Sequence, residues 1–276
     1  IRKRIENQIK VFINKMEGLE VLVEVPIEEQ EEYTPYLNVE HLKGLKETSQ
    51  VFLKENGYIV DEPDFTDLTE EQFIRYIKSH SNSFLVEKFK DIFEENFRSI
   101  MSNIYKHQDS DRTMLIFFLP TSENRANVGI ETVKNFCKLI IMLGCNEGVL
   151  ITEKSLTPKS KEQLESSNVK NDCRNNVYNV ISYLDEKFIN IVDHCLSPKI
   201  LKIYSGKELE KFEQENKVDS KFFPRMFTTD PVAKFYCAKP GDVIMMKRKT
   251  GTTNTLIREQ IVYRKVFYEV GKDVKK

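Results

Sequence analysis

The sequence predicts an α/β domain followed by a small α+β domain that contains a mixed sheet. The first prediction rests on Thr113–Leu119, a continuous apolar run typical of a strand covered on both faces. A helical pattern follows over 129–143, and a second apolar segment lies at 148–152. Strand, helix and strand in under 45 residues indicate a parallel crossover. Residues 188–192 are predicted to supply a third strand.

The second domain is predicted from turn and capping residues near the C-terminus. Asp230 is a good helix N-cap, and Pro231 suits the first helical position because proline lacks an amide hydrogen. Pro240 and Gly241 occupy the second and third positions of a type II turn, whose third position needs positive φ. The segments expected to pair as strands after this turn are 243–248 and 261–268.

The remaining pattern is mostly helical. Apolar spacing predicts helices over 39–56 and 84–105. Thr69 and Ser205 each precede Gln or Glu by three residues, which is the spacing of a capping box at a helix start. The other segments predicted are an amphipathic helix within 1–38, a short strand at 58–60 and a polar insertion over 161–183 that opens with a short helix.

Composition and charge exclude several classes of protein. The chain is 40% hydrophobic and 31% charged, as in globular proteins, and no apolar run approaches the ~18 residues needed to cross a membrane. Five scattered cysteines without a C-x-x-C pair argue against a disulfide framework or a zinc site. Residues 221–276 contain 13 Lys and Arg against 5 Asp and Glu, which gives a net charge of +8. The rest of the chain contains 29 Lys and Arg against 38 Asp and Glu and is therefore acidic. The basic end favours a polyanion or an acidic partner, or else is a solvated face.

Patterns for catalysis and for cofactors are missing. The loop after Thr113–Leu119 has no G-x-G-x-x-G or G-K-[ST] sequence, and the four histidines lie far apart. Asp185-Glu186-Lys187 has the Asp-x-Lys form in which a carboxylate binds a metal and lysine helps to activate water. Its other interpretation is a solvated approach to the strand at 188–192. We expect no catalytic residue, no metal site and no cofactor.

Residues 224–248 resemble the assembly domain of the fifth subunit that eukaryotic nuclear RNA polymerases share, and of its archaeal counterpart. The family carries a Pro-Arg pair, an Asp-Pro-Val-Ala motif, a Lys-Pro-Gly turn and an apolar run that ends in arginine. The matching residues are Pro224-Arg225, Asp230 to Ala233, Lys239 to Gly241, and Arg248. Tyr263-Arg264 matches a later Tyr-Arg pair, whereas Gly251 replaces a glutamate of the family pattern.

The resemblance extends into the first domain. Val128-Gly129 and the helix after it are similar to the eukaryotic subunit. The eukaryotic jaw domain approaches downstream duplex DNA with a Thr-Pro-Ser-Ala loop. A similar loop here consists of Thr157, Pro158, Lys159 and Ser160, of which the first two match. The resemblance implies that these four residues contact DNA phosphates. An ordinary turn before a helix is the alternative.

The implied organisation is an N-terminal extension (1–38), a jaw-like α/β domain (39–193) with a nuclease-like three-layer fold, and a C-terminal assembly domain (197–276). The implied function is that of a non-catalytic subunit of a multisubunit DNA-directed RNA polymerase, which docks on the largest subunit through its C-terminal domain. The subunit-interface residues implied are Pro224, Arg225, Asp230, Pro231, Lys239, Pro240, Gly241, Asp242, Arg248, Tyr263 and Arg264.

The expected partners are the largest and other polymerase subunits and downstream duplex DNA, with no membrane and no homo-oligomer. A free-standing DNA-binding transcription regulator is the first alternative, and a metal-dependent nuclease that uses Asp185 and Lys187 is the second. The Lys-, Asn- and Ile-rich composition is typical of an AT-rich eukaryote or a large DNA virus. Localisation is then the nucleus for a cellular protein, and the host cytoplasm or the virion for a viral one.

Overall fold

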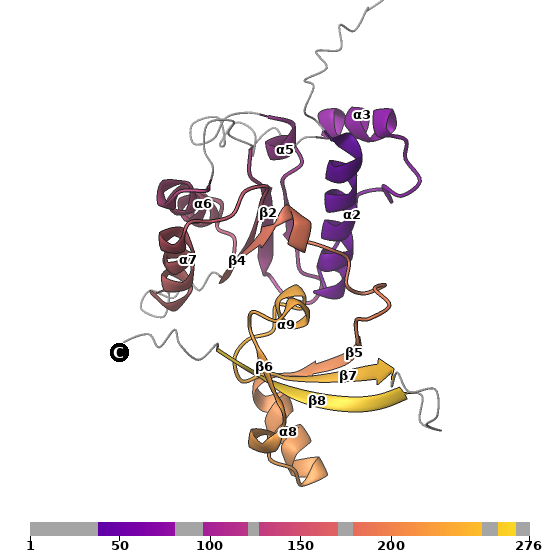
Figure 1. Cartoon of the computed structure of the whole chain (residues 1–276), viewed down its shortest axis with the longest axis vertical. Helices are drawn as coiled ribbons and strands as arrows, with labels where there is room; N and C mark the ends of the chain where they lie inside the picture. Colours follow the sequence, from indigo (N-terminus) through magenta and orange to yellow (C-terminus); the bar gives the residue numbers. More distant parts are fainter. Residues whose placement is uncertain (1–37, 81–95, 121–126, 171–178, 250–258, 269–276) are drawn as a thin grey trace, which may run out of the picture. The chain divides into compact units, whose positions relative to one another are not determined.

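The computed structural model describes residues 38–80, 96–120, 127–170, 179–249 and 259–268 (Figure 1). The helix predicted within 1–38 lies outside them. The described strands form two four-stranded sheets, ordered β1-β2-β3-β4 and β5-β7-β8-β6, and helices pack on both. The architecture is therefore α+β. We call residues 38–188 the N-terminal part and residues 199–268 the C-terminal part, each as far as it is described.

The predicted crossover is confirmed in the N-terminal part. β2 (Thr113–Phe118) and β3 (Glu147–Thr152) are parallel neighbours, and α6 (Ile130–Leu143) connects them. Every residue of β3 is buried, which explains the continuous apolar run at its centre, residues 148–151. α6 ends where Gly144 adopts a left-handed φ of 65°. In Figure 1, α6 and α7 lie on one side of this sheet and α2 on the other.

The predicted third strand was wrong. The strand that pairs in parallel with β3 is β4 (Asn179–Leu184), whereas 188–192 forms no strand. The segment 161–183 also contains more regular structure than the short helix predicted at its start, because α7 (Pro158–Lys170) covers its first residues and β4 its end. Within β4 only Val180 and Tyr183 are fully buried, so the strand lacks the continuous apolar run that made β2 and β3 recognisable.

The helix predicted over 84–105 was wrong in its described portion. α5 (Phe97–Ile100) is a single turn, and β1 (Asn103–Lys106) follows as an antiparallel edge strand beside β2. Asn96 and Ser99 form a capping box that starts α5. The Ser102 hydroxyl accepts the Phe118 amide at 3.0 Å and so ties the chain to β2 where the helix stops.

Two further helices complete the described N-terminal part, α2 (Val39–Glu55) and α3 (Glu70–His80). The capping box at Thr69 is confirmed, since its amide donates to Gln72 Oε1 at 2.9 Å and its hydroxyl accepts the Gln72 amide at 3.3 Å. The strand predicted at 58–60 reduces to one bridge between Tyr58 and His107.

The C-terminal part has the predicted mixed sheet. β5 (Lys199–Tyr204), β7 (Val243–Lys249) and β8 (Glu259–Phe267) are antiparallel, and β6 (Arg225–Phe227) adds to β8 in parallel. The buried core of this part consists of Met226, Ala233, Ile244, Met246 and Val266. The helices of this part are α8 (Gly206–Asn216), α9 (Pro231–Phe235) and the 3₁₀ turn η3 (Ser220–Phe222). A further 3₁₀ turn, η2 (Asp185–Lys187), follows β4 in the N-terminal part.

The capping box predicted at Ser205 was wrong. Ser205 does stand at the N-cap position of α8, but its side chain makes no capping hydrogen bond. The next residue, Gly206, has a φ of 49°. α8 contacts β5 through Phe212, whose ring stacks on Tyr204 with 4.4 Å between ring centroids.

Candidate subunit and nucleic-acid interface

α9 begins as the sequence predicts. The Asp230 carboxylate accepts the Val232 amide at 2.9 Å, and Pro231 occupies the first helical position. The Lys234 amide closes the first turn on the Asp230 carbonyl at 2.9 Å. Asp230 and Pro231 therefore act through local geometry, because they fix where the helix starts.

The turn after α9 is attached to the last strand. Gly241 adopts a φ of 100°, and the Asp242 amide donates to the Lys239 carbonyl at 3.0 Å, as a type II turn requires. The Asp242 carboxylate accepts the Lys239 amide at 2.7 Å, and burial raises the pKa of this carboxyl group. The Gly241 amide and the Asp242 carbonyl both bond to Val266 of β8. The turn thus holds β7 in register with β8.

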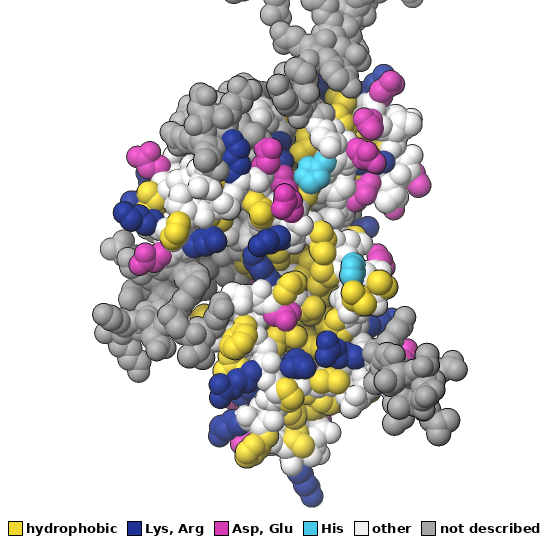
Figure 2. All heavy atoms as spheres, in the orientation of Figure 1, with side chains coloured by type: hydrophobic (Ala, Val, Ile, Leu, Met, Phe, Trp, Pro, Cys, Tyr) yellow, Lys and Arg dark blue, Asp and Glu magenta, His cyan; other side chains and the backbone are white. Residues whose placement is uncertain are grey.

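The basic residues of the predicted interface differ in exposure. Arg225, Lys239 and Arg248 are exposed, as is Pro224, whereas Arg264 is partly buried and donates to the Arg225 carbonyl at 3.3 Å. The Arg225 guanidinium lies 5.1 Å from the centre of the Phe267 ring. In Figure 2, Lys and Arg side chains lie among hydrophobic ones over the C-terminal part. Such a mixed surface suits an acidic or amphipathic partner.

Tyr263 is held inside the C-terminal part. Its ring stacks on Phe223 at 5.4 Å and lies 5.5 Å from Phe212. We conclude that Tyr263 supports the sheet, because its ring is covered by neighbours of its own part.

The predicted DNA-contact loop lies at the start of α7. Pro158 and Lys159 are exposed and Thr157 is partly exposed. The Ser160 side chain is fully buried and donates to the Val128 carbonyl at 2.9 Å. The Thr157 hydroxyl accepts the Ser160 amide at 3.3 Å and so caps the helix. Pro158 and Lys159 are thus presented to solvent, whereas Ser160 fixes the loop from beneath.

Asp185 does not lie in a solvated approach to a strand, as the sequence indicated. It follows β4, is buried, and accepts two hydrogen bonds from the Arg98 guanidinium, at 2.7 and 2.9 Å. His41 Nε2 lies 3.5 Å from the same carboxylate. No group of three acidic, histidine or cysteine side chains suited to a metal occurs among the described residues. The Asp185 carboxylate therefore forms a buried ion pair with Arg98.

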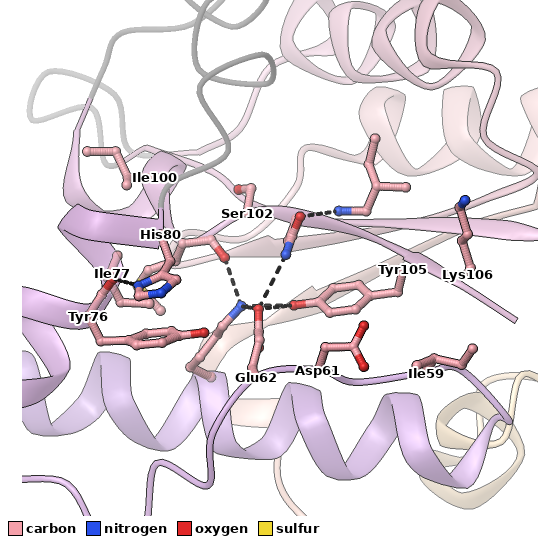
Figure 3. Close-up of a pocket in the computed structure, with 14 residues that line it drawn as sticks. Ile59, Asp61, Glu62, Tyr76, Ile77, His80, Ile100, Ser102, Tyr105 and Lys106 are labelled. Carbon is pink, nitrogen blue, oxygen red and sulfur yellow. Dashed lines mark hydrogen bonds and ion pairs between the residues drawn. The ribbon is translucent and has the colours of Figure 1, made fainter. Parts of the chain in front are cut away.

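A polar cavity of about 490 Å³ lies beside β1 (Figure 3). The Lys46 ammonium is buried in its wall and donates to Glu62 at 2.8 Å, the Tyr105 hydroxyl at 2.9 Å and the Met101 carbonyl at 3.1 Å. Burial lowers the pKa of Lys46 in spite of the neighbouring Glu62 carboxylate. With three hydrogen bonds made, this lysine stabilises the packing of α2 against β1.

Comparison with known proteins identifies the family. Residues 189–266 match the family model described as RNA polymerase Rpb5, C-terminal domain. A DNA-directed RNA polymerase subunit Rpo5 of Methanothrix thermoacetophila is 36% identical over 76 residues, which cover 91% of that protein and 28% of this chain. The chain belongs to the Rpb5/Rpo5 family of RNA polymerase subunits. The subunit RPABC1 of DNA-directed RNA polymerases I, II and III of Caenorhabditis elegans is 21% identical over 227 residues, 82% of this chain and 97% of that protein.

The Rpb5 match spans every predicted interface residue, but sequence reasoning missed the exposed apolar side chains of the same part. Phe222 is 86% exposed, and Phe227, Leu201 and Ile261 are each more than 40% exposed. No sequence signal separates them from core residues, because each stands in or beside a strand or 3₁₀ turn as a core residue would. No described helix is long and apolar enough to cross a membrane.

The cap of α9 gives a direct test of the Rpb5-type C-terminal part. Replacing Asp230 with alanine is expected to lower the free energy of unfolding by about 1 kcal/mol, because the Val232 amide loses its acceptor. Asp230→Asn keeps an oxygen acceptor and is the matched control. Urea unfolding measures both variants, and equal losses from the two would show that the cap is not the cause.

Proposed function

We propose that this chain is a non-catalytic subunit of a DNA-directed RNA polymerase and that its C-terminal part docks on the largest subunit. The observation that carries the proposal is the Rpb5 match over 189–266, which includes the capped helix α9 and the turn at Gly241. We further propose a jaw-like domain over 39–193 and an assembly domain over 197–276, preceded by an extension over 1–38.

The exposed basic residues support the docking surface. Arg225, Lys239 and Arg248 can reach a partner, and Phe222 and Phe227 offer aromatic side chains near them in the sequence. Aromatic residues and arginine carry much of the binding energy in protein interfaces. The remaining interface candidates, Asp230 and Pro240 among them, act by holding this surface in shape.

Co-purification tests the docking. A tagged wild-type chain expressed in its own cell is expected to purify with the large polymerase subunits. The double variant Arg225→Glu/Arg248→Glu is expected to reduce the recovered polymerase by about tenfold, because charge reversal at an interface repels the partner. The control variant is Lys207→Glu/Lys211→Glu, which makes the same charge change on the exposed side of α8.

Each outcome of this experiment has one meaning. Loss of polymerase from both variants, or from neither, contradicts docking through Arg225 and Arg248. Recovery of a wild-type chain that binds duplex DNA tightly but carries no polymerase contradicts the subunit role. That result favours the free-standing regulator, whose binding would fall steeply with salt.

The N-terminal part is proposed to lie beside downstream DNA. The support is the exposed Pro158 and Lys159 at the N-terminus of α7, where a helix favours a phosphate. A photo-crosslinker at position 159 in the purified polymerase is expected to label downstream DNA, whereas one at Lys211 should not. Labelling from neither position, or from Lys211 alone, contradicts this orientation.

A role in transcription implies a nuclear location for a cellular protein, and the host cytoplasm or the virion for a viral one.

A further inference from the structure

α9 has two sides that face different parts of the chain. Ala233 is fully buried and belongs to the core of the C-terminal sheet. Phe235, two residues later, is also buried but is not a member of that core. Its ring packs instead on Phe52 of α2, with 5.3 Å between ring centres and an edge-to-face angle of 87°. A helix of five residues therefore places one side chain in each part.

The ring of Phe235 joins an aromatic cluster of the N-terminal part. Phe52 lies 6.3 Å from Tyr183 of β4 and 5.9 Å from Phe188, between ring centres. Tyr183 and Phe188 are 4.9 Å apart. All three are buried. Without the N-terminal part, Phe235 would lose this edge-to-face neighbour and expose its apolar ring to water, which is unfavourable.

Polar contacts surround this aromatic contact. Asn56 Nδ2 donates to the Phe235 carbonyl at 2.9 Å, and the Tyr236 hydroxyl donates to Glu55 at 3.1 Å. The Lys234 ammonium donates to the Ser182 carbonyl and lies 4.1 Å from the centre of the Tyr183 ring. Three consecutive residues, 234 to 236, therefore bind the end of α2 and β4.

We propose that α9 fixes the orientation of the two parts relative to each other, and that Lys234, Phe235 and Tyr236 are its positioning residues. The turn and cap that shape the C-terminal part thereby also set where the N-terminal part is held. The archaeal relative matches over nearly its whole length with only 76 residues, so α9 gains this second role only in chains that carry an N-terminal part. The inference is independent of the polymerase role.

Hydrogen exchange on the full chain tests this proposal. Phe235→Ala is expected to speed amide exchange by about tenfold in peptides covering 52–58 and 181–188, since these segments lose their cover. Amides of β7 and β8 serve as an internal reference and should keep their protection. The matched control is Phe212→Ala, which removes the same side chain from α8 of the C-terminal part, where Phe212 contacts Tyr204 and Tyr263.

A second variant covers the case in which Phe235→Ala unfolds the C-terminal part. Asn56→Ala/Tyr236→Phe removes two hydrogen bonds across the contact, together with one from Asn56 to the Phe52 carbonyl, and leaves all the aromatic rings in place. It is expected to speed exchange at 52–58 and 181–188 by about threefold, with β7 and β8 unchanged. Unchanged exchange in those two segments in this variant would overturn the proposal. A similar change in Phe212→Ala would overturn it as well, since Phe212 lies outside the contact.

Discussion

Replacing Arg98 with alanine is expected to lower the free energy of unfolding by about 3–5 kcal/mol, because it leaves a buried carboxylate without its partner. The Arg98 guanidinium donates twice to Asp185 and once to the Leu119 carbonyl, at 3.0 Å. Both charged side chains are about 95% buried. Among the described residues that form ion pairs with Asp185, His41, at 3.5 Å, would remain near the carboxylate. Urea unfolding of the full chain measures the loss.

Two comparisons make the Arg98 result interpretable. Lys211→Ala breaks an exposed pair with Glu215 and is expected to change stability by less than about 0.5 kcal/mol. Arg98→Met/Asp185→Leu replaces both charges with apolar side chains and is expected to recover much of the loss, since no charge stays buried. A loss below about 1 kcal/mol in Arg98→Ala would mean that Asp185 reaches water, and the nuclease hypothesis would then regain support.

The sequence was informative wherever the structural cause is local. The crossover from β2 through α6 to β3 was predictable because both strands are covered on two faces and read as continuous apolar runs. Asp230 and Gly241 were predictable because a cap and a left-handed turn place chemical demands on single residues.

Features that depend on distant partners were not predictable. β4 alternates buried Val180 and Tyr183 with half-exposed residues, and its identity depends on the edge that β3 leaves free. Asp185 pairs with Arg98, which lies 87 residues away in the sequence, and no local sequence pattern predicts such a pair. The prediction was therefore right for β2 and β3, the central strands of the first sheet, and wrong for its edge strands β1 and β4.

In the candidate interface, too, the sequence does not predict which side chains are buried by residues distant in the chain. Phe227 and Phe235 each lie within two residues of a basic residue, Arg225 or Lys234, yet the first is 41% exposed and the second is buried against Phe52. Only the position of the N-terminal part distinguishes them. The family resemblance identified the segment that the Rpb5 model matches, but the division between exposed residues and residues buried in contacts needed the structure.

Lys234 is expected to make stability depend on pH. Burial, followed by the positive charges of Lys187 and Lys161, lowers the pKa of Lys234 to about 8 from its ordinary 10.5. Below pH 8 the amine is protonated in both states, and the folded state carries the cost of burying the charge. Between pH 8 and 10.5 the unfolded chain holds more protons, so this group makes stability rise with pH. The rise is up to about 3 kcal/mol.

Lys234→Met removes this dependence. The difference in unfolding free energy, wild type minus variant, is expected to increase from about pH 7.5 to 10.5 by up to about 3 kcal/mol. Groups that titrate in both proteins cancel in that difference. Lys207→Met, on the exposed side of α8, is the matched control and should give a flat difference. A flat difference for Lys234→Met as well would mean that the ammonium stays solvated, and the contact between α9 and β4 would then be looser than its hydrogen bond to Ser182 indicates.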